Sequence, residues 1–188
     1  ERLENAVHEL GAPMPVIDRQ RPWFAALSLA QLLIARAGYD PEAGVDRTLH
    51  QLAETSGKTI RRLETIEQQL LAFADLPEQV QIDYLLHGLT QIGEEANMLD
   101  DLVKAWRAGD MARLDSIMIE GELKDQPEIY EALMVRRNAA WTDTLDLVLQ
   151  DEAGVFFIAV GAGHLAGQDS LQVMLAARGH HVERLTPP

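Results

Sequence analysis

The sequence predicts a helix-rich α/β fold in which a large helical insertion packs over a small mixed sheet. The main evidence for a sheet is residues 155–160, six apolar residues in a row with strong strand preference. An unbroken apolar run is typical of a strand that is buried on both faces, because a half-exposed strand alternates. The main evidence for helices is the three- and four-residue spacing of apolar side chains through the middle of the chain.

Two further segments have the pattern of short strands. Residues 58–63 alternate and include β-branched side chains, and residues 180–185 near the end of the chain are similar. Glu64 lies at the carboxyl end of the first of these segments.

Prolines, glycines and capping residues mark the ends of the predicted helices. Gly38 and Gly57 end the first two, and Asp46 is the candidate cap of the second. The longest predicted helix has apolar residues at alternating steps of four and three, a spacing that also occurs in coiled coils. A stripe of only about three heptads more often packs within the chain than forms a coiled-coil seam. The predicted ranges are 23–37, 47–56, 77–108, 111–119, 127–150 and 168–178.

Composition limits the classes of function. The chain has 188 residues, 47% of them hydrophobic, which is enough for one domain with a core. Its formal charge of −14 repels phosphate backbones, so nucleic acid is not an expected partner. There is no cysteine, so a metal would need histidine and carboxylate ligands. No apolar run approaches the roughly 20 residues of a membrane span.

His164 is the first candidate for chemistry. It follows Gly161-Ala162-Gly163 directly after the predicted buried strand. In open α/β sheets, ligands bind at the carboxyl ends of the strands, where this imidazole would project. The alternative is that His164 only caps or hydrogen-bonds a loop.

Arg137 and Asn138 form the second candidate. Arg137 falls on the apolar stripe of its predicted helix, beside Met134 and Trp141. A guanidinium on a buried face is costly unless an anion meets it, so it would orient a site carboxylate or bind a substrate oxyanion. A structural ion pair, or a side chain that reaches solvent, are the alternatives.

Glu64 is the candidate carboxylate. If its strand and that of His164 are neighbours, the two side chains converge and supply half of a metal site or an acid–base site. Glu67 lies one helical turn further on, and helix capping is the preferred reading for both Glu67 and Asp46.

Several short motifs occur in a characteristic order along the chain. They are Arg21-Pro22-Trp23, Gly44-Val45-Asp46, Gly57-Lys58, the segment 63–68, Arg137-Asn138 and the closing segment 160–185, VGAGHLAGQDSLQVMLAARGHHVERL. In this order and spacing they resemble the TraB/PrgY/GumN family. Its animal relatives include the Tiki proteins, and its fold is related to ChaN and to erythromycin-esterase-like proteins.

The resemblance implies a metal-dependent hydrolase that acts on peptide bonds, with a peptide or a small molecule as its substrate. Manganese, cobalt or zinc would be held by two Gly-x-x-His histidines and carboxylates, and would activate water. In this chain the resemblance assigns His164 and Glu64 to the metal, and Glu64, Arg137 and Asn138 to catalysis. Arg136 stands where the family usually has an acidic residue.

The earlier Gly-x-x-His of the family, and the acidic residue after it, have no match here. The chain also opens at Glu1 rather than at a methionine. We therefore expect a single domain over residues 1–188 that lacks its amino-terminal strand segment and holds no metal tightly. Loss of that segment would expose the edge of strand 155–160 and favour a homo-oligomer.

The resemblance leaves other functions open. Family members are linked with plasmid pheromone shutdown and polysaccharide production, and related folds bind haem, so a ligand-binding or regulatory module is the alternative. A structural domain without a site is the third reading. Bacterial members commonly carry export signals, which implies a periplasmic or exported location.

Overall fold

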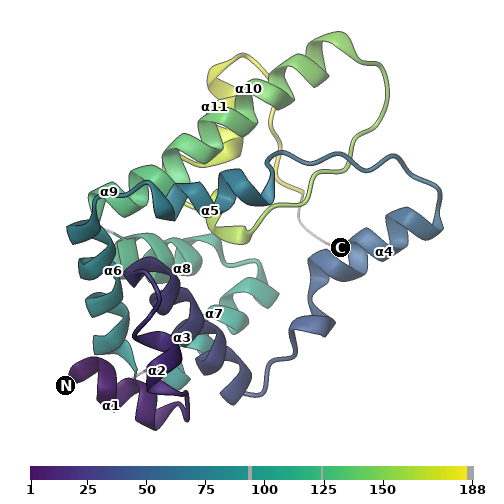
Figure 1. Ribbon diagram of the computed structural model, residues 1–188. Helices are drawn as coiled ribbons and strands as arrows, with labels where there is room; N and C mark the ends of the chain where they lie inside the picture. Colours follow the sequence, from purple (N-terminus) through teal and green to yellow (C-terminus); the bar gives the residue numbers. More distant parts are fainter. Residues whose placement is uncertain (93–94, 124, 186–188) are drawn as a thin grey trace. The chain divides into compact units, whose positions relative to one another are not determined.

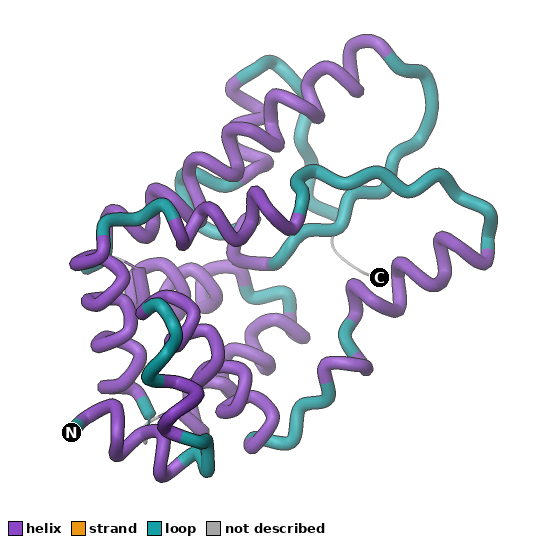
Figure 2. Tube along the Cα trace, viewed as in Figure 1, coloured by secondary structure: helices purple, strands orange, loops and turns teal. Residues whose placement is uncertain are grey.

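The structure is a computed structural model that describes residues 1–92, 95–123 and 125–185 (Figure 1). Every regular element in these ranges is a helix, and Figure 2 shows helices and loops only. The predicted α/β fold with a mixed sheet is therefore wrong, and the described part of the chain is all-α. It divides into two compact units, Glu1–Asp100 and Asp101–Pro188. The single domain over residues 1–188 stays a prediction.

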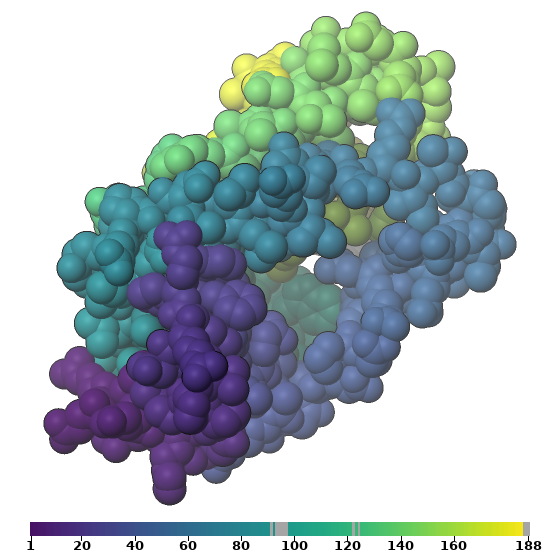
Figure 3. All heavy atoms as spheres, in the orientation of Figure 1, coloured from purple at the N-terminus to yellow at the C-terminus, as the bar shows by residue number. Residues whose placement is uncertain are grey.

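The first unit is built from short helices around a small apolar core. Val7, Ile17, Ala25, Leu29 and Leu89 are among the buried core residues. The atoms of residues 1–36, coloured purple to dark blue, form a continuous surface in Figure 3. Its helices are α1 (Arg2–Glu9), α2 (Met14–Ile17), α3 (Pro22–Arg36), η1 (Pro41–Ala43), α4 (Val45–Thr55), α5 (Ile66–Ala74) and α6 (Glu78–Gln91).

The first two predicted helices, 23–37 and 47–56, are confirmed as α3 and α4 to within two residues. The cap of α4 was predicted wrongly. Gly44 is its N-cap, and Asp46 lies in the first turn. A carboxylate in that position still stabilises the helix through the macrodipole, although it makes no capping hydrogen bond.

The three predicted strands are extended loops. Residues 58–63, 155–160 and 180–185 have no regular structure. Val155 and Phe157 are 102% and 80% exposed, so the segment expected to be the most buried strand is a solvent-facing loop. A strand forms only when neighbours satisfy its backbone groups and cover its side chains, and none of the described segments does this.

The predicted helix 77–108 is two helices. α6 ends at Gln91 because Ile92 has an extended backbone with ψ of 104°, and α7 runs from Glu95 to Ala108. Residues 93 and 94 lie outside the described part of the chain. Trp106 was expected to point inward but is 48% exposed, while its neighbour Ala105 is buried.

The second unit continues from α7. Its helices are α8 (Met111–Asp115), η2 (Ser116–Leu123), α9 (Pro127–Tyr130), η3 (Glu131–Val135), α10 (Arg136–Asp151), η4 (Ala162–Leu165) and α11 (Leu171–Ala177). The predicted helix 127–150 is confirmed as the run from α9 to α10. Gly121 does not end the helix before it, since η2 continues past it to Leu123 in π-helical form.

Charged side chains connect α10 to the residues that follow α11. Asp146 accepts hydrogen bonds of 2.7 Å from His180 Nε2 and from Gln150 Nε2. Arg178 forms ion pairs with Asp143 and Asp146. The hydrogen bond from His180, followed by that from Gln150, lowers the pKa of Asp146, and the charge of Arg178 acts in the same direction.

No helix in the described residues is long and apolar enough to cross a membrane.

We predict that Asp146→Asn lowers stability at neutral pH and has less effect in acid. A carboxyl whose pKa is lowered in the folded state stabilises the fold above its ordinary pKa, and this stabilisation is lost as the pH falls through the folded-state value. Thermal unfolding between neutral pH and about pH 3 measures the effect. Asp143→Asn is the control, because Asp143 pairs with Arg178 but not with His180. A deficit that stays constant into acid would contradict the prediction.

A second prediction concerns the apolar loop 155–160, which we expect to cause self-association. Replacing both Val155 and Phe157 by Glu should make the protein more monomeric without lowering its melting temperature, because both side chains are exposed. Light scattering after size exclusion measures this. Leu147 and Leu149, exposed at 61% and 47%, provide the matched control pair of Glu substitutions. A wild-type chain that is monomeric at high concentration would refute the prediction.

Candidate functional site

His164 is buried in the second unit, at the end of the apolar loop. It lies in the short helix η4, and its residue is only 7% exposed. The ring atom Nδ1 is 2.7 Å from Oδ1 of Asn138, a residue of α10 that is 1% exposed. Two of the predicted site residues therefore form a direct, buried pair.

The amide of Asn138 determines which nitrogen of His164 carries the proton. Its Nδ2 donates to the backbone oxygens of Asp169, at 2.8 Å, and of His164, at 3.4 Å. Oδ1 is therefore the atom that faces the ring, and it can only accept. His164 Nδ1 must carry the hydrogen, so in the neutral ring the lone pair is on Nε2.

Gly163 allows the backbone of the histidine loop to approach the neighbouring helices closely. A Cβ on Gly163 would lie 2.8 Å from Met118 Cε and 3.2 Å from Met134 Cε. These methionines belong to η2 and η3, the two π-helical segments, and such segments are frequent at functional sites. A side chain at Gly163, immediately before the histidine, would therefore require the ends of these methionine side chains to move.

Gly167 has a comparable role a few residues later. Its φ of 75° is strained for any residue with a side chain, and a Cβ there would lie 2.9 Å from Oδ1 of Asp115. The loop that carries His164 therefore favours glycine at Gly167 for its backbone conformation and is closely packed at Gly163.

An aromatic side chain packs against the imidazole. The ring centroid of Trp141 is 4.4 Å from that of His164, with the planes tilted by 51°. The guanidinium carbon of Arg137 lies 4.9 Å from the centroid of the same indole. Trp141 therefore contacts both the imidazole and a permanent cation.

Arg137 is partly buried, whereas its place on the apolar stripe predicted a largely buried side chain. Its Nη1 donates to the backbone oxygen of Leu133 at 3.0 Å, and its guanidinium covers Trp141. Glu64, the predicted partner of Arg137, belongs to the first unit, while Arg137 and His164 belong to the second. The convergence of these three side chains stays a prediction.

Glu64 immediately precedes the start of α5. Thr65 is the N-cap of that helix and forms a reciprocal capping box with Gln68. Glu67, predicted to cap, lies in the first turn, where its charge favours the helix while Thr65 and Gln68 make the capping hydrogen bonds.

A second polar pair beside the histidine loop was missed from the sequence. The hydroxyl of Tyr130 donates to Asp169 Oδ2 at 2.9 Å. Burial raises the pKa of Tyr130 to about 12, with further contributions from the hydrogen bond and charge of Asp169. The only sequence signal was the position of Tyr130 on the same helical stripe as Arg137.

The last helix was expected to start at Gln168 or Asp169. Instead Ser170 is the N-cap of α11, without a side-chain capping bond. Ser170 Oγ is fully buried and has no hydrogen-bond partner among the described residues, His164 included, so these residues show no histidine-activated serine.

The described residues around His164 do not make up a metal centre. No three His, Asp or Glu side chains among them come together in a way that could hold an ion. A catalytic zinc needs about three protein ligands. The imidazole itself contacts the amide of Asn138 and the indole of Trp141.

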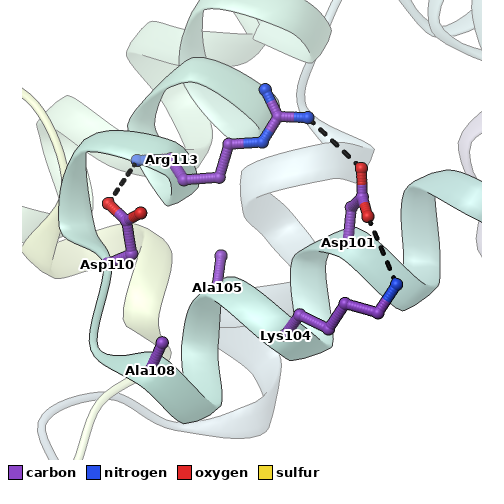
Figure 4. Close-up of a pocket in the computed structure, with 6 residues that line it drawn as sticks. All are labelled: Asp101, Lys104, Ala105, Ala108, Asp110 and Arg113. Atoms are coloured by element: carbon purple, nitrogen blue, oxygen red, sulfur yellow. Dashed lines mark hydrogen bonds and ion pairs between the residues drawn. The ribbon is translucent and has the colours of Figure 1, made fainter.

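A shallow pocket of the second unit lies away from this pair, at the end of α7 and the start of α8 (Figure 4). Asp101 pairs there with Lys104 at 3.6 Å and with Arg113 at 3.3 Å. Asp110 caps α8 through the backbone nitrogen of Arg113. The charges that line this pocket compensate one another, and no histidine is among its lining residues. The pocket is therefore a weaker candidate than the His164 loop.

The structure thus defines a helical protein with a buried, amide-oriented histidine on a glycine-rich loop. The chain belongs to the TraB/PrgY/gumN family, whose model matches residues 1–184. This result confirms the family suggested by the motifs and by the closing segment.

Its curated relatives are similar over nearly the whole chain. It is 29% identical over 191 residues to the uncharacterized protein YbaP of Escherichia coli K12, covering 93% of this chain and 65% of that protein. The YbaP protein of Shigella flexneri gives the same figures. The chain is also 27% identical over 185 residues to an uncharacterized protein of Treponema pallidum, and the match covers 91% of this chain and 54% of that protein. No solved structure matches.

We predict that Arg137→Ala costs about 1 kcal/mol of stability, because it removes the guanidinium from Trp141. Arg137→Lys should recover only part of this, since an ammonium lacks the planar stacking surface. Chemical denaturation measures both. Arg136→Ala is the control, because Arg136 is exposed and pairs with Glu131. A loss on the order of 3–5 kcal/mol would instead indicate a buried ion pair with a carboxylate.

Proposed function

We propose that this chain contributes part of the active site of a metal-dependent hydrolase of the TraB/PrgY/gumN family, with His164 as a metal ligand through Nε2. The observation that carries the proposal is the 2.7 Å contact between His164 Nδ1 and Asn138 Oδ1. Metal-binding histidines usually donate their second ring N–H to a fixed acceptor, which sets the tautomer and the orientation of the ring.

The nature of this acceptor supports a ligand role over a proton-transfer role. A general base must become an imidazolium, and in Ser-His-Asp triads a carboxylate stabilises that cation. The partner of His164 is a neutral amide, which adds no negative charge that would favour the imidazolium. The neutral imidazole is the form that binds metals.

Other residues of the chain support the orientation of this ring. Trp141 packs against the imidazole and limits its access to water. Gly163 and Gly167 let the loop pass close to η2 and α8. These contacts hold the imidazole in one position, as a site of this kind requires.

The remaining donors belong to the proposal and not to the observed geometry. Glu64 is the candidate carboxylate within this chain, and Arg137 the candidate group for a substrate oxyanion. The chain spans 65% of the length of YbaP, so the activity of a whole family member is also part of the proposal. Peptide hydrolysis and a periplasmic or exported location rest on the family resemblance alone.

The second candidate is a ligand-binding or regulatory module without catalysis, which rests on the family resemblance. Such a protein would bind a peptide or another small molecule and would not need a complete set of metal ligands. Among the described residues, no group of three His, Asp or Glu side chains could hold a metal ion.

The two functions differ in their response to metal. We predict that Zn²⁺ or Mn²⁺ binds the chain 1–188 weakly and at His164, because one fixed imidazole is too few donors for tight binding. Calorimetric titration gives the affinity, and zinc-induced change of the ¹⁵N shift of His164 Nε2 identifies the ligand atom. His164→Ala should abolish the shift, whereas His181→Ala, at an exposed residue, should leave it unchanged.

Asn138→Ala should weaken metal binding by about 10–100-fold, since it removes the group that orients the ligand. Peptide cleavage by the full-length protein with Mn²⁺ should fall in the same order of variants. Metal binding that is equal in the wild type and in His164→Ala would refute the ligand role. Metal binding without peptide cleavage would favour the regulatory module.

A further inference from the structure

We propose that Asp169, held by Tyr130, is a positioning residue that fixes the tautomer of His164. Three hydrogen bonds connect the four residues Tyr130, Asp169, Asn138 and His164 in sequence, and the middle one reaches the backbone of Asp169. Tyr130 donates to Asp169 Oδ2 at 2.9 Å, Asn138 Nδ2 donates to the backbone oxygen of Asp169 at 2.8 Å, and Asn138 Oδ1 accepts from His164 Nδ1 at 2.7 Å. The importance of this series of hydrogen bonds for catalysis rests on the proposed function, whereas its effect on the tautomer of His164 does not.

The first step is that the amide of Asn138 depends mainly on Asp169. Its two acceptors are unequal, because the bond to Asp169 is 2.8 Å and that to His164 is 3.4 Å, at the weak end of the normal range. Without the oxygen of Asp169, little would prevent the amide from turning over.

The second step is that a turned amide changes the imidazole. Nδ2 would then face His164 Nδ1 and donate to it, so Nδ1 would need its lone pair and the proton would move to Nε2. That tautomer presents a hydrogen at the nitrogen proposed to bind metal. The position of Asp169 therefore determines which nitrogen of His164 carries the lone pair, although the side chain of Asp169 does not contact His164.

The third step is that Tyr130 keeps Asp169 in place. Asp169 lies on a loop without regular structure, two residues after Gly167 with its φ of 75°. Its side chain is tied to the end of α9 by the phenol of Tyr130. Burial keeps this phenol protonated up to about pH 12, and the nearby charges of Asp169, Asp115 and Glu131 act in the same direction, so the donor is present at neutral pH.

The test is the tautomer of His164, measured through its two ring ¹⁵N shifts in the metal-free chain. The wild type should show the Nδ1–H form. Asp169→Ala and Tyr130→Phe should each lower the ratio of the Nδ1–H to the Nε2–H form by about two- to tenfold, the effect of one hydrogen bond. Asp169→Asn should restore most of the ratio, because its side-chain oxygen still accepts from Tyr130.

Tyr39→Phe is the matched control. Tyr39 also donates to a carboxylate, Asp100 Oδ1 at 3.4 Å, but in the first unit. Its removal should leave the His164 shifts unchanged. If Asp169→Ala does not fold, Tyr130→Phe still tests the proposal, since it removes one hydroxyl and keeps the ring.

An unchanged tautomer in folded Tyr130→Phe, or equal ratios in Asp169→Ala and Asp169→Asn, would overturn the positioning role. This result is independent of the proposed function, because the readout needs neither metal nor substrate. A shifted tautomer in a chain that binds no metal would support the positioning role and refute the metal site alone.

Discussion

The histidine loop depends on one buried group, the side-chain amide of Asn138. A buried amide must satisfy its donors and its acceptor inside the protein, because water is not there to do so. Asn138 does this with the backbone oxygens of His164 and Asp169 and with the imidazole itself. The side chain of Asn138 on α10 thereby holds the loop at His164 and at Asp169, and it also orients the imidazole. The same loop is closely packed at Gly163, where a Cβ would lie 2.8 Å from Met118 Cε.

Helices could be predicted from the sequence because their signals are local. The periodicity and end residues of 23–37 and 127–150 correspond closely to α3 and to the run from α9 to α10. The strands could not be predicted in this way. The composition of 155–160 indicates what environment would suit these residues, but it does not supply a neighbour to pair with. Phe157 is therefore exposed although its residue type favours burial.

The site shows the same limit. His164 and Asn138 were found separately, one from a glycine-rich segment and the other beside a cation on an apolar stripe. Their contact joins residues 26 apart in sequence, and that of Tyr130 with Asp169 joins residues 39 apart. No spacing rule covers such distances. Asp169 also lies next to a helix, so local sequence assigned it, or Gln168, to the helix start and gave no indication of its bond to Tyr130.

The choice of an amide as the partner of His164 has a chemical consequence. A carboxylate at this position would favour the imidazolium, whereas the Asn138 amide adds no charge. In the neutral ring, this amide leaves the lone pair on Nε2, because its own oxygen accepts from Nδ1. The indole of Trp141 contacts both the imidazole and the guanidinium of Arg137. Arg137 therefore has a packing role on this stripe of α10 that does not depend on Glu64.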